Sequence, residues 1–475
     1  MVKAGEGRWG IVALVVAAIA VLLVEPGGWQ VALAGLATVL LARDRRFGPM
    51  AAALVVVLAL PYDRAANSDL LRLAGVPLRP QDAAIAIGIV LTLPSVRRPR
   101  LSAPLVAIAL FSLVGIGALL GGLVADLPLR DIFRDARWWF LYLAGALALA
   151  AGVRRDQVLR GLLLGAAIFS MMVIAATLLP EFAGGLKQRA LVFDSGTLRM
   201  QFGNTIFLIP ALAAALWRFL AASSWRRGML IWLLLTAGVL SLTRTFVIVL
   251  ILTAVAVTVA VWWSQKRSQT RPLLVIGGIV LAATLSGMFF NVGNAMLEQA
   301  IDVALGQPAE APNAGESVFD RFLFEGDRSD VGSIVEGRFA TYQRAFTVLL
   351  ASPVVGHGLG TLVVVNYVFG GDPFATPGWL PNVDNAYLTV GMKAGVVGIA
   401  VFAAMILVLP LTLVRDRRLR WLMPWLLPAW GGILVLTMTQ SFAITGYSPY
   451  GLSLLIVLGE LGYASRNTAR ARPQL

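Results

Sequence analysis

The residue types with the greatest chemical potential gather in one stretch of an otherwise apolar chain, Gly337–Gly398. Arg338 and Arg344 lie on an amphipathic run there, about a turn and a half apart. Guanidinium groups bind phosphate oxygens in a bidentate fork and stay charged when partly desolvated. The two arginines therefore predict a site for an anionic group such as a phosphate.

Two groups in the same stretch could accept a proton. Asp384 and Asn385 stand directly before a long apolar segment, so a helix N-terminus would hold Asp384 ionised. His357 is the only histidine in the chain, and imidazole suits proton exchange near neutral pH. Both positions also have structural explanations, since Asp and Asn are preferred helix N-caps and a histidine between glycines can be a solvated turn residue. We favour Asp384 as the base, keep His357 as the alternative, and include Asn385 in the catalytic set.

These side chains belong to a chain whose composition is that of a membrane protein. Hydrophobic residues make up 58% of its 475 residues and charged residues 13%, and its mean hydropathy is +0.81. Soluble domains are about 45–50% apolar and about 25% charged, so the sequence predicts a polytopic membrane protein. The chain has no cysteine and no HExxH or P-loop pattern, which argues against zinc chemistry and ATP hydrolysis. We expect no metal, no cofactor and no nucleic-acid partner.

The apolar runs predict an all-α transmembrane bundle. About 20 apolar residues cross a bilayer, and on that scale the chain holds about 14 spans, with about 12 to 14 compatible with the pattern. They are expected near residues 9–24, 29–42, 48–61, 82–94, 103–124, 138–152, 158–180, 203–221, 229–242, 245–263, 273–290, 386–413, 421–440 and 449–464. Three parts follow: a bundle over 1–290, an extracytoplasmic loop over 291–385 that forms a small helical cap with the candidate site, and C-terminal spans with a cytoplasmic tail over 386–475.

Positive charge fixes the expected orientation. Alternate loops hold 24 of the 39 Lys and Arg residues but only four acids. Such loops face the cytoplasm, so both termini are predicted on the cytoplasmic side, and the segment from Asn291 to Asp384 outside. The first apolar run offers no small-x-small cleavage site, and we expect it to remain as an anchor.

Several arginines oppose this bias because they fall in the predicted outer segments. Arg130, Arg134 and Arg137 alternate with acids at helical spacing and are expected to pair with them. Arg244 lies in an SLTRT turn between two apolar spans with few acids nearby, which favours a functional role. The predicted diphosphate-binding set comprises Arg199, Arg244, Arg338 and Arg344. Lys393 lies about two turns inside the span after Asp384, on the opposite helix face, and an ionisable residue at that depth is also a functional candidate.

The order of these motifs resembles the O-antigen ligase and O-antigen polymerase superfamily. The resemblance covers roughly Gln201–Gly398 at the level of motifs and the whole chain at the level of topology. It rests on an FGNTIFLIPAL segment, an arginine in a tight turn, an amphipathic helix running into P-x-x-G-x-G, and x-N-x-Y-L before a glycine-punctuated span. These are Phe202–Leu212, Arg244, Arg338, Pro353–Gly358, Asp384–Leu388, Gly395 and Gly398.

The resemblance implies a glycosyltransferase that works at the outer face of the inner membrane. Its substrate would be an undecaprenyl-diphosphate-linked oligosaccharide, and its acceptor a glycan or a lipid. Family ligases carry a histidine where this chain has Asp384, and their span tends to carry an acid where Lys393 stands. Both departures favour an exopolysaccharide or O-antigen polymerase over a ligase. Other polysaccharide-assembly proteins are expected partners.

Two other classes of function fit the same residues. A transporter or flippase could use the arginines to guide a lipid-linked or anionic glycan, although the spans offer little buried charge for coupling ions and no matching halves. The third hypothesis is that the chain is a non-catalytic membrane protein in an envelope assembly complex.

Overall fold

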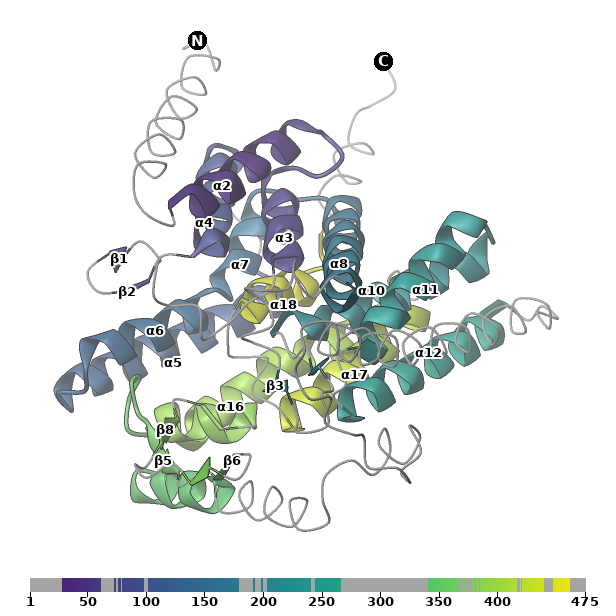
Figure 1. Ribbon diagram of the computed structural model, residues 1–475. Coiled ribbons are helices and arrows are strands. Elements are labelled where there is room, and N and C mark those ends of the chain that lie inside the picture. Colours follow the sequence, from purple (N-terminus) through teal and green to yellow (C-terminus); the bar gives the residue numbers. More distant parts are fainter. Residues whose placement is uncertain are drawn as a thin grey trace, which may run out of the picture.

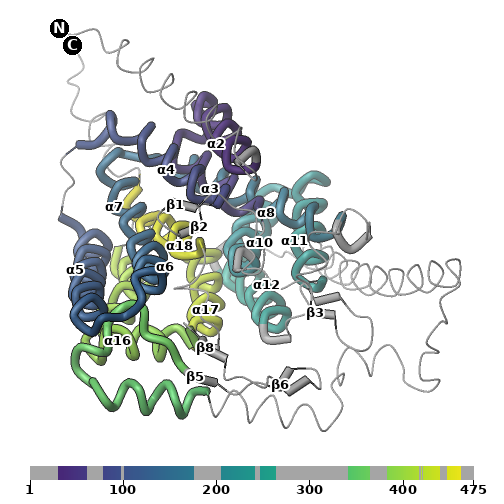
Figure 2. Tube along the Cα trace, turned by 60° about the vertical axis from the view of Figure 1, so that its left-hand side comes forward, coloured from purple at the N-terminus to yellow at the C-terminus, as the bar shows by residue number. Residues whose placement is uncertain are grey.

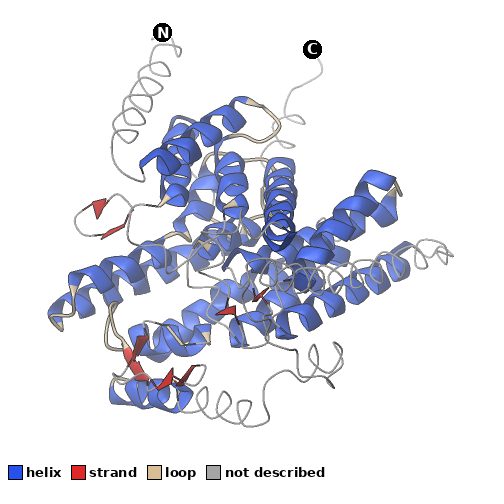
Figure 3. Ribbon diagram, in the orientation of Figure 1, coloured by secondary structure: helices blue, strands red, loops and turns tan. Residues whose placement is uncertain are grey.

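The computed structural model describes most of the helical body of the chain and is coloured by secondary structure in Figure 3. The described residues are 28–60, 79–97, 101–178, 203–240, 244–265, 341–365, 385–416, 421–439 and 447–461, with short pieces at 72–73, 76–77, 191–192, 198–199, 368–369, 372–373, 378–380, 382–383 and 419. The expected spans near 9–24 and 273–290 lie outside them.

One group of helices surrounds α3 (Figure 1). Its members are α2 (Gly28–Arg43), α3 (Pro49–Ala59), α4 (Pro80–Thr92) and α8 (Arg155–Leu178). Every residue of α3 from Met50 to Ala59 is buried, which explains why this helix is apolar all round rather than on one face.

A second group forms around α10 (Leu208–Ala221), which follows a short 3-10 turn, η2 (Gly203–Phe207). α10 packs against α11 (Trp225–Leu240), α12 (Arg244–Gln265) and α17 (Met423–Thr439). The expectation of two helices interrupted around SLTRT is confirmed, since α11 ends at Leu240 and α12 begins at Arg244.

The third group carries the region of interest and contains α5 (Ala103–Val124) and α16 (Ala386–Arg415) side by side (Figure 2). α6 (Leu129–Phe140) returns along α5, where Trp139 stacks on Phe111 with ring centroids 4.4 Å apart and its indole N–H donates to the Phe111 carbonyl at 3.0 Å. Gly115 of α5 makes this approach possible, because a Cβ there would lie 2.4 Å from the Trp139 ring. α7 (Leu143–Ala150) and α18 (Ser448–Ile456) complete the group, and η1 (Leu93–Ser95) follows α4.

The prediction of a single span over 138–152 is wrong. The region is divided between α6, which ends at Phe140, and the eight-residue α7, which begins at Leu143. α6 buries a face that includes Ile132 and Trp139, while all its charged residues except Asp135 lie outside that face, so it is an amphipathic helix and not an apolar span.

Four of the described helices are long and apolar enough to cross a membrane: Ala103–Val124, Arg155–Ala175, Phe246–Trp263 and Ala386–Arg415. Shorter apolar helices, Gln30–Arg43, Pro49–Ala59, Thr205–Ala221 and Met423–Met438, stand beside them. On α5, for example, the side chains of Leu110, Leu113, Ile116 and Leu120 are exposed, as expected for a helix that faces lipid. The protein is therefore an integral membrane protein, and the number of spans in the whole chain stays a prediction.

The all-α expectation holds for this helical body, but short strand pairs are added to it. β1 (Arg72–Leu73) pairs with β2 (Val76–Pro77), and β3 (Leu191–Val192) with β4 (Leu198–Arg199). β5 (Val363–Val365) pairs antiparallel with β8 (Gly378–Leu380) and encloses the pair β6 (Val368–Phe369) and β7 (Asp372–Pro373). The described part of the expected helical cap thus includes small β-hairpins beside its helix.

Candidate functional site

The candidate site is built around a break in α16. Gly395 adopts φ 65° and ψ −166° inside this helix, so the helical hydrogen bonds that would cross it are lost. In a continuous helix, the N–H groups of Val396 and Val397 would donate to the carbonyls of Met392 and Lys393. The break frees two donors and two acceptors in a helix apolar and long enough to cross a membrane, where each needs a new partner.

The glycine-rich loop at residues 352–361 supplies all four partners. Its motif P-x-x-G-x-G runs antiparallel to the break and exchanges backbone hydrogen bonds with it. The His357 N–H donates to the Met392 carbonyl at 2.9 Å, the Gly358 N–H to Lys393 at 3.0 Å, the Val396 N–H to Pro353 at 2.7 Å and the Val397 N–H to Val354 at 3.4 Å. The loop and the broken helix therefore form one unit, because neither satisfies its backbone alone.

Glycines make this approach possible. Gly358 has φ 94°, and a Cβ on it would lie 2.1 Å from the Gly122 nitrogen of α5. Gly356 has φ 71°, and its Cβ would lie 2.4 Å from the Ala394 nitrogen. Since backbone atoms cannot rotate away, the two glycines of the motif are required by contact as well as by conformation.

A buried ion pair lies beside this junction. The Lys393 ammonium pairs with the Asp135 carboxylate of α6, and these residues are only 2% and 4% exposed. The same carboxylate oxygen accepts from the Gly360 N–H of the loop at 2.8 Å. Lys393 also donates to the Asn382 side-chain oxygen at 3.3 Å. One carboxylate therefore ties together α6, α16 and the loop.

Asp135 was missed by the sequence reasoning, which treated Lys393 as a candidate without a partner. A signal was present: Asp135 occupies the buried stripe of α6 together with Ile132 and Trp139, at i, i+3 and i+7. A carboxylate on an apolar stripe needs a buried partner. The partner could not be identified because Lys393 is 258 residues away in sequence.

The expected pairing of the α6 arginines with acids is confirmed for two of them. Arg134 pairs with Asp131 at 2.6 Å and also reaches Asp135 at 3.4 Å. Arg137 pairs with Asp82 of α4 at 2.8 Å, so its partner comes from another helix and not from the alternating segment.

Arg344 lies on the helix over residues 341–351, which confirms the amphipathic run. Thr341, Ala345 and Leu349 of this helix are buried, whereas Arg344 is exposed. Ala345 packs with Met392 of α16 in a small apolar cluster. The helix is therefore held against the start of α16 while its arginine stays accessible.

His357 and Asn385 both make structural hydrogen bonds. The His357 Nε2 lies 2.8 Å from the Val348 carbonyl, so this nitrogen carries the proton and donates it to the helix. Asn385 is the N-cap of α16: its side-chain oxygen accepts from the Leu388 N–H at 3.0 Å, and its amide donates to the Met438 carbonyl at 2.9 Å. The cap is thus Asn385 and not the preceding Asp384.

Other predicted site residues fall beyond this description. Asp384 and Arg338 lie outside the described residues. Arg244 is the first residue of α12 and Arg199 the last of β4, and only their backbones are described. Among the described residues, no group of three or more His, Cys, Asp or Glu side chains could hold a metal ion.

Part of the chain that contains the candidate site matches a known protein family. Residues 229–403 match the family model described as O-antigen ligase, and a search of curated proteins returns no match. The matched segment runs from α11 into α16 and includes the candidate residues Arg244, Arg338, Arg344, His357, Asp384 and Asn385. Over this segment the match confirms the resemblance drawn from the motifs: residues 229–403 are similar to the family described as O-antigen ligase.

Proposed function

We propose that the protein is a membrane glycosyltransferase that polymerises a glycan carried on undecaprenyl diphosphate, at the outer face of the inner membrane. The observation that carries this proposal is the O-antigen ligase match over residues 229–403. That segment contains both the broken helix with its docked loop and three of the four predicted arginines, Arg244, Arg338 and Arg344. Transfer to a lipid acceptor, the ligase reaction, is the less favoured form of the same chemistry.

The proposed reaction is a displacement at the anomeric carbon. A hydroxyl of the acceptor glycan forms the new bond to that carbon, the bond to the diphosphate oxygen breaks, and its electron pair leaves with undecaprenyl diphosphate. The hydroxyl proton passes to a base, for which we propose Asp384. Arginines would stabilise the charge that develops on the diphosphate, so the reaction needs no metal ion.

The helix start favours Asp384 over His357 as the base. Asp384 directly precedes Asn385, the N-cap of α16, in the sequence. The His357 backbone contacts Met392, seven residues and about 10 Å further along the helix. Its Nε2 already donates to a helix carbonyl, which fits a residue that holds the loop in place.

The diphosphate would be bound by arginines from three segments. Arg344 projects from a helix that packs on α16, and Arg244 opens α12, where the helix N-terminus adds backbone donors suited to a phosphate. We propose that Arg338 and Arg199 complete this set.

The buried Lys393–Asp135 pair bears on the alternative function as a transporter, because a transporter needs buried charges that bind coupling ions. Lys393 and Asp135 do place charge inside the helical body. However, the pair neutralises itself and bonds to the loop backbone through Gly360, which suits a fixed structural element better than a moving ion site.

Turnover of a purified lipid-linked repeat unit tests the proposal. The protein is reconstituted in liposomes without ion gradient or ATP and with a metal chelator, and products are separated by length. We expect a ladder of longer glycans on the lipid carrier. A single glycan on an added lipid acceptor would indicate the ligase reaction. Movement of the substrate across the bilayer without elongation would refute the glycosyltransferase.

The proposed orientation has its own test, because a chain without cysteine allows clean labelling. A single cysteine introduced at Asn313 should react with a membrane-impermeant reagent in intact spheroplasts. Protection until lysis would place this segment in the cytoplasm and overturn the orientation.

A further inference from the structure

A second set of arginines lies at the loops that the charge pattern assigns to the cytoplasm. The loop between α2 and α3 and the start of α8 border an open cavity of about 230 Å³. Its lining carries a net charge of +3, from four arginines against one aspartate: Arg45, Arg46, Arg154, Arg160 and Asp156, with Gln157 between them.

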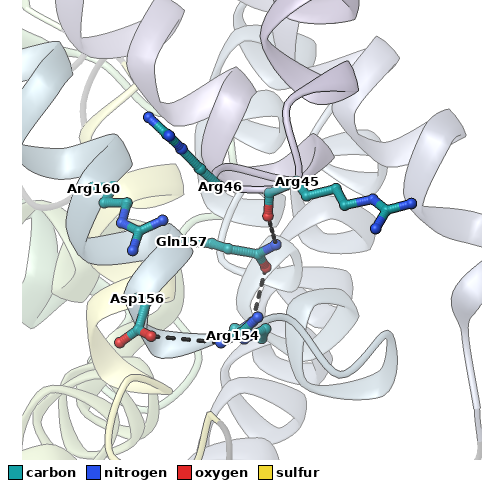
Figure 4. Close-up of a pocket in the computed structure, with 6 residues that line it drawn as sticks. All are labelled: Arg45, Arg46, Arg154, Asp156, Gln157 and Arg160. Carbon is teal, nitrogen blue, oxygen red and sulfur yellow. Dashed lines mark hydrogen bonds and ion pairs between the residues drawn. The ribbon is translucent and has the colours of Figure 1, made fainter.

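Gln157 holds the two sides of this cavity together. Its amide donates to the Arg45 carbonyl at 3.2 Å, and its oxygen accepts from the Arg154 N–H at 3.1 Å. In Figure 4 the side chains of Arg46 and Arg160 extend to the same side of Gln157, whereas Arg45 extends to the other. The arginines are therefore gathered by a built contact between two loops.

The cavity lacks the acids that would neutralise it. Its one aspartate, Asp156, lies 3.7 Å from Arg154, and no carboxylate of the described residues forms an ion pair with Arg46 or Arg160. Two guanidinium groups on one side of a concave surface match the oxygens of a phosphate.

Apolar stripes lead from this cavity along both adjoining helices. On α8, Arg160 is followed at helical spacing by Leu164, Ile168 and Met171, which are partly or largely exposed. On α2, the helix that runs into the arginine loop exposes Leu33, Leu36 and Leu40, by 52%, 42% and 53%. Exposed apolar stripes of this kind suit acyl chains, so a ligand that combines a phosphate with hydrocarbon would match both the cavity and its surroundings.

We propose that this cavity binds the headgroup of an anionic phospholipid from the cytoplasmic leaflet. Arg46 and Arg160 contact the phosphate, and the acyl chains lie along α8. The alternative is that these arginines are solvated and serve only the excess of positive charge on the cytoplasmic side. That role requires neither the Gln157 hydrogen bonds between the two loops nor an adjoining apolar stripe. Basic pockets between helices on the cytoplasmic side are suited to such headgroups.

Binding of phosphatidylglycerol to the purified full-length protein in neutral detergent tests the inference, with native mass spectrometry and thermal unfolding as readouts. Each arginine near an anionic lipid surface contributes about fivefold in affinity. The double variant Arg46→Gln/Arg160→Gln should therefore bind phosphatidylglycerol about thirtyfold more weakly, with its lipid-free melting temperature unchanged. Zwitterionic phosphatidylethanolamine should bind weakly to both proteins.

The matched control is Arg97→Gln/Arg415→Gln, which removes the same charge from two other loops predicted to be cytoplasmic. It should keep nearly all the affinity for phosphatidylglycerol. An equal loss in both double variants would show that only net charge matters and would overturn the site. Stabilisation by inorganic phosphate, with no additional effect of phosphatidylglycerol, would replace the lipid by a free phosphate and also refute the proposal.

Discussion

Removing either partner of the Lys393–Asp135 pair should be severely destabilising. Both side chains are almost fully buried, at 2% and 4% exposure. Loss of one partner leaves the other as an uncompensated buried charge, which costs about 3–5 kcal/mol. Lys393→Met leaves the carboxylate with Gly360 at 2.8 Å and Arg134 at 3.4 Å, so it should lie near the lower figure. Asp135→Asn leaves the ammonium with neutral oxygens only, that of Asn382 at 3.3 Å and that of the new amide, and should lie near the upper figure.

The double variant separates the pair from its surroundings. Lys393→Met/Asp135→Asn removes both charges, while the asparagine oxygen still accepts from the Gly360 N–H. Its cost should not exceed that of either single variant. With single costs of about 3 and about 5 kcal/mol, the coupling free energy should then be at least about 5 kcal/mol.

The free energy of unfolding can be measured by denaturant titration in mixed micelles, followed by tryptophan fluorescence. The exposed pair Arg154–Asp156, with side chains 67% and 63% accessible, provides the control, and Arg154→Gln should change stability by less than about 1 kcal/mol. If the two buried variants also cost under about 1 kcal/mol and their effects add, the pair is solvated and the reasoning is wrong.

Three further changes test the loop, the proposed clamp and the proposed base. Gly358→Ala should cost about 3 kcal/mol or more, from the left-handed φ and the backbone overlap, whereas Gly117→Ala, which meets no atom within 4 Å, should slightly stabilise α5; equal melting temperatures would contradict the docked loop. The variants Arg244→Lys, Arg338→Lys and Arg344→Lys should each lower polymer output about tenfold or more, because a point charge loses the bidentate geometry. Near wild-type output from all three variants would exclude the proposed diphosphate-binding role of these arginines. Asp384→Asn should fold normally, because Asn385 makes the cap, yet lose about 10²–10⁴-fold in rate, while His357→Gln stays active; the reverse result would make His357 the base.

The local sequence pattern was sufficient to predict a helix where the apolar run and the residues that start or stop helices mark the same ends. α5 begins after Ser102, whose hydroxyl accepts from the Leu105 N–H at 3.4 Å, has Pro104 in its first turn and contains no charge, so both of its ends were predicted. The start of α16 was predicted for a similar reason, because Asn385 is a strong N-cap before a long apolar run. In the same way, the order of the motifs was sufficient to predict the family segment.

The region 138–152 shows why a prediction from the sequence pattern fails where an apolar run overlaps the end of an amphipathic helix. The apolar run that begins at Trp138 suggested one span, but the amphipathic period of the preceding residues continues to Phe140 and packs α6 on α5. Tertiary contact with Phe111 and Gly115 decided where the helix ends, and neither residue is near it in sequence.

The junction itself could be decided only by the tertiary structure. The sequence determined that the motif P-x-x-G-x-G forms a turn, that Gly395 interrupts a long apolar segment and that Lys393 lies about two turns inside that segment. It could not show that the turn fills the break at Gly395, nor that Asp135 neutralises Lys393. The physical reason is that buried donors, acceptors and charges must each find a partner. When those partners lie far apart in the chain, as Asp135 and Lys393 do, only folding brings them together.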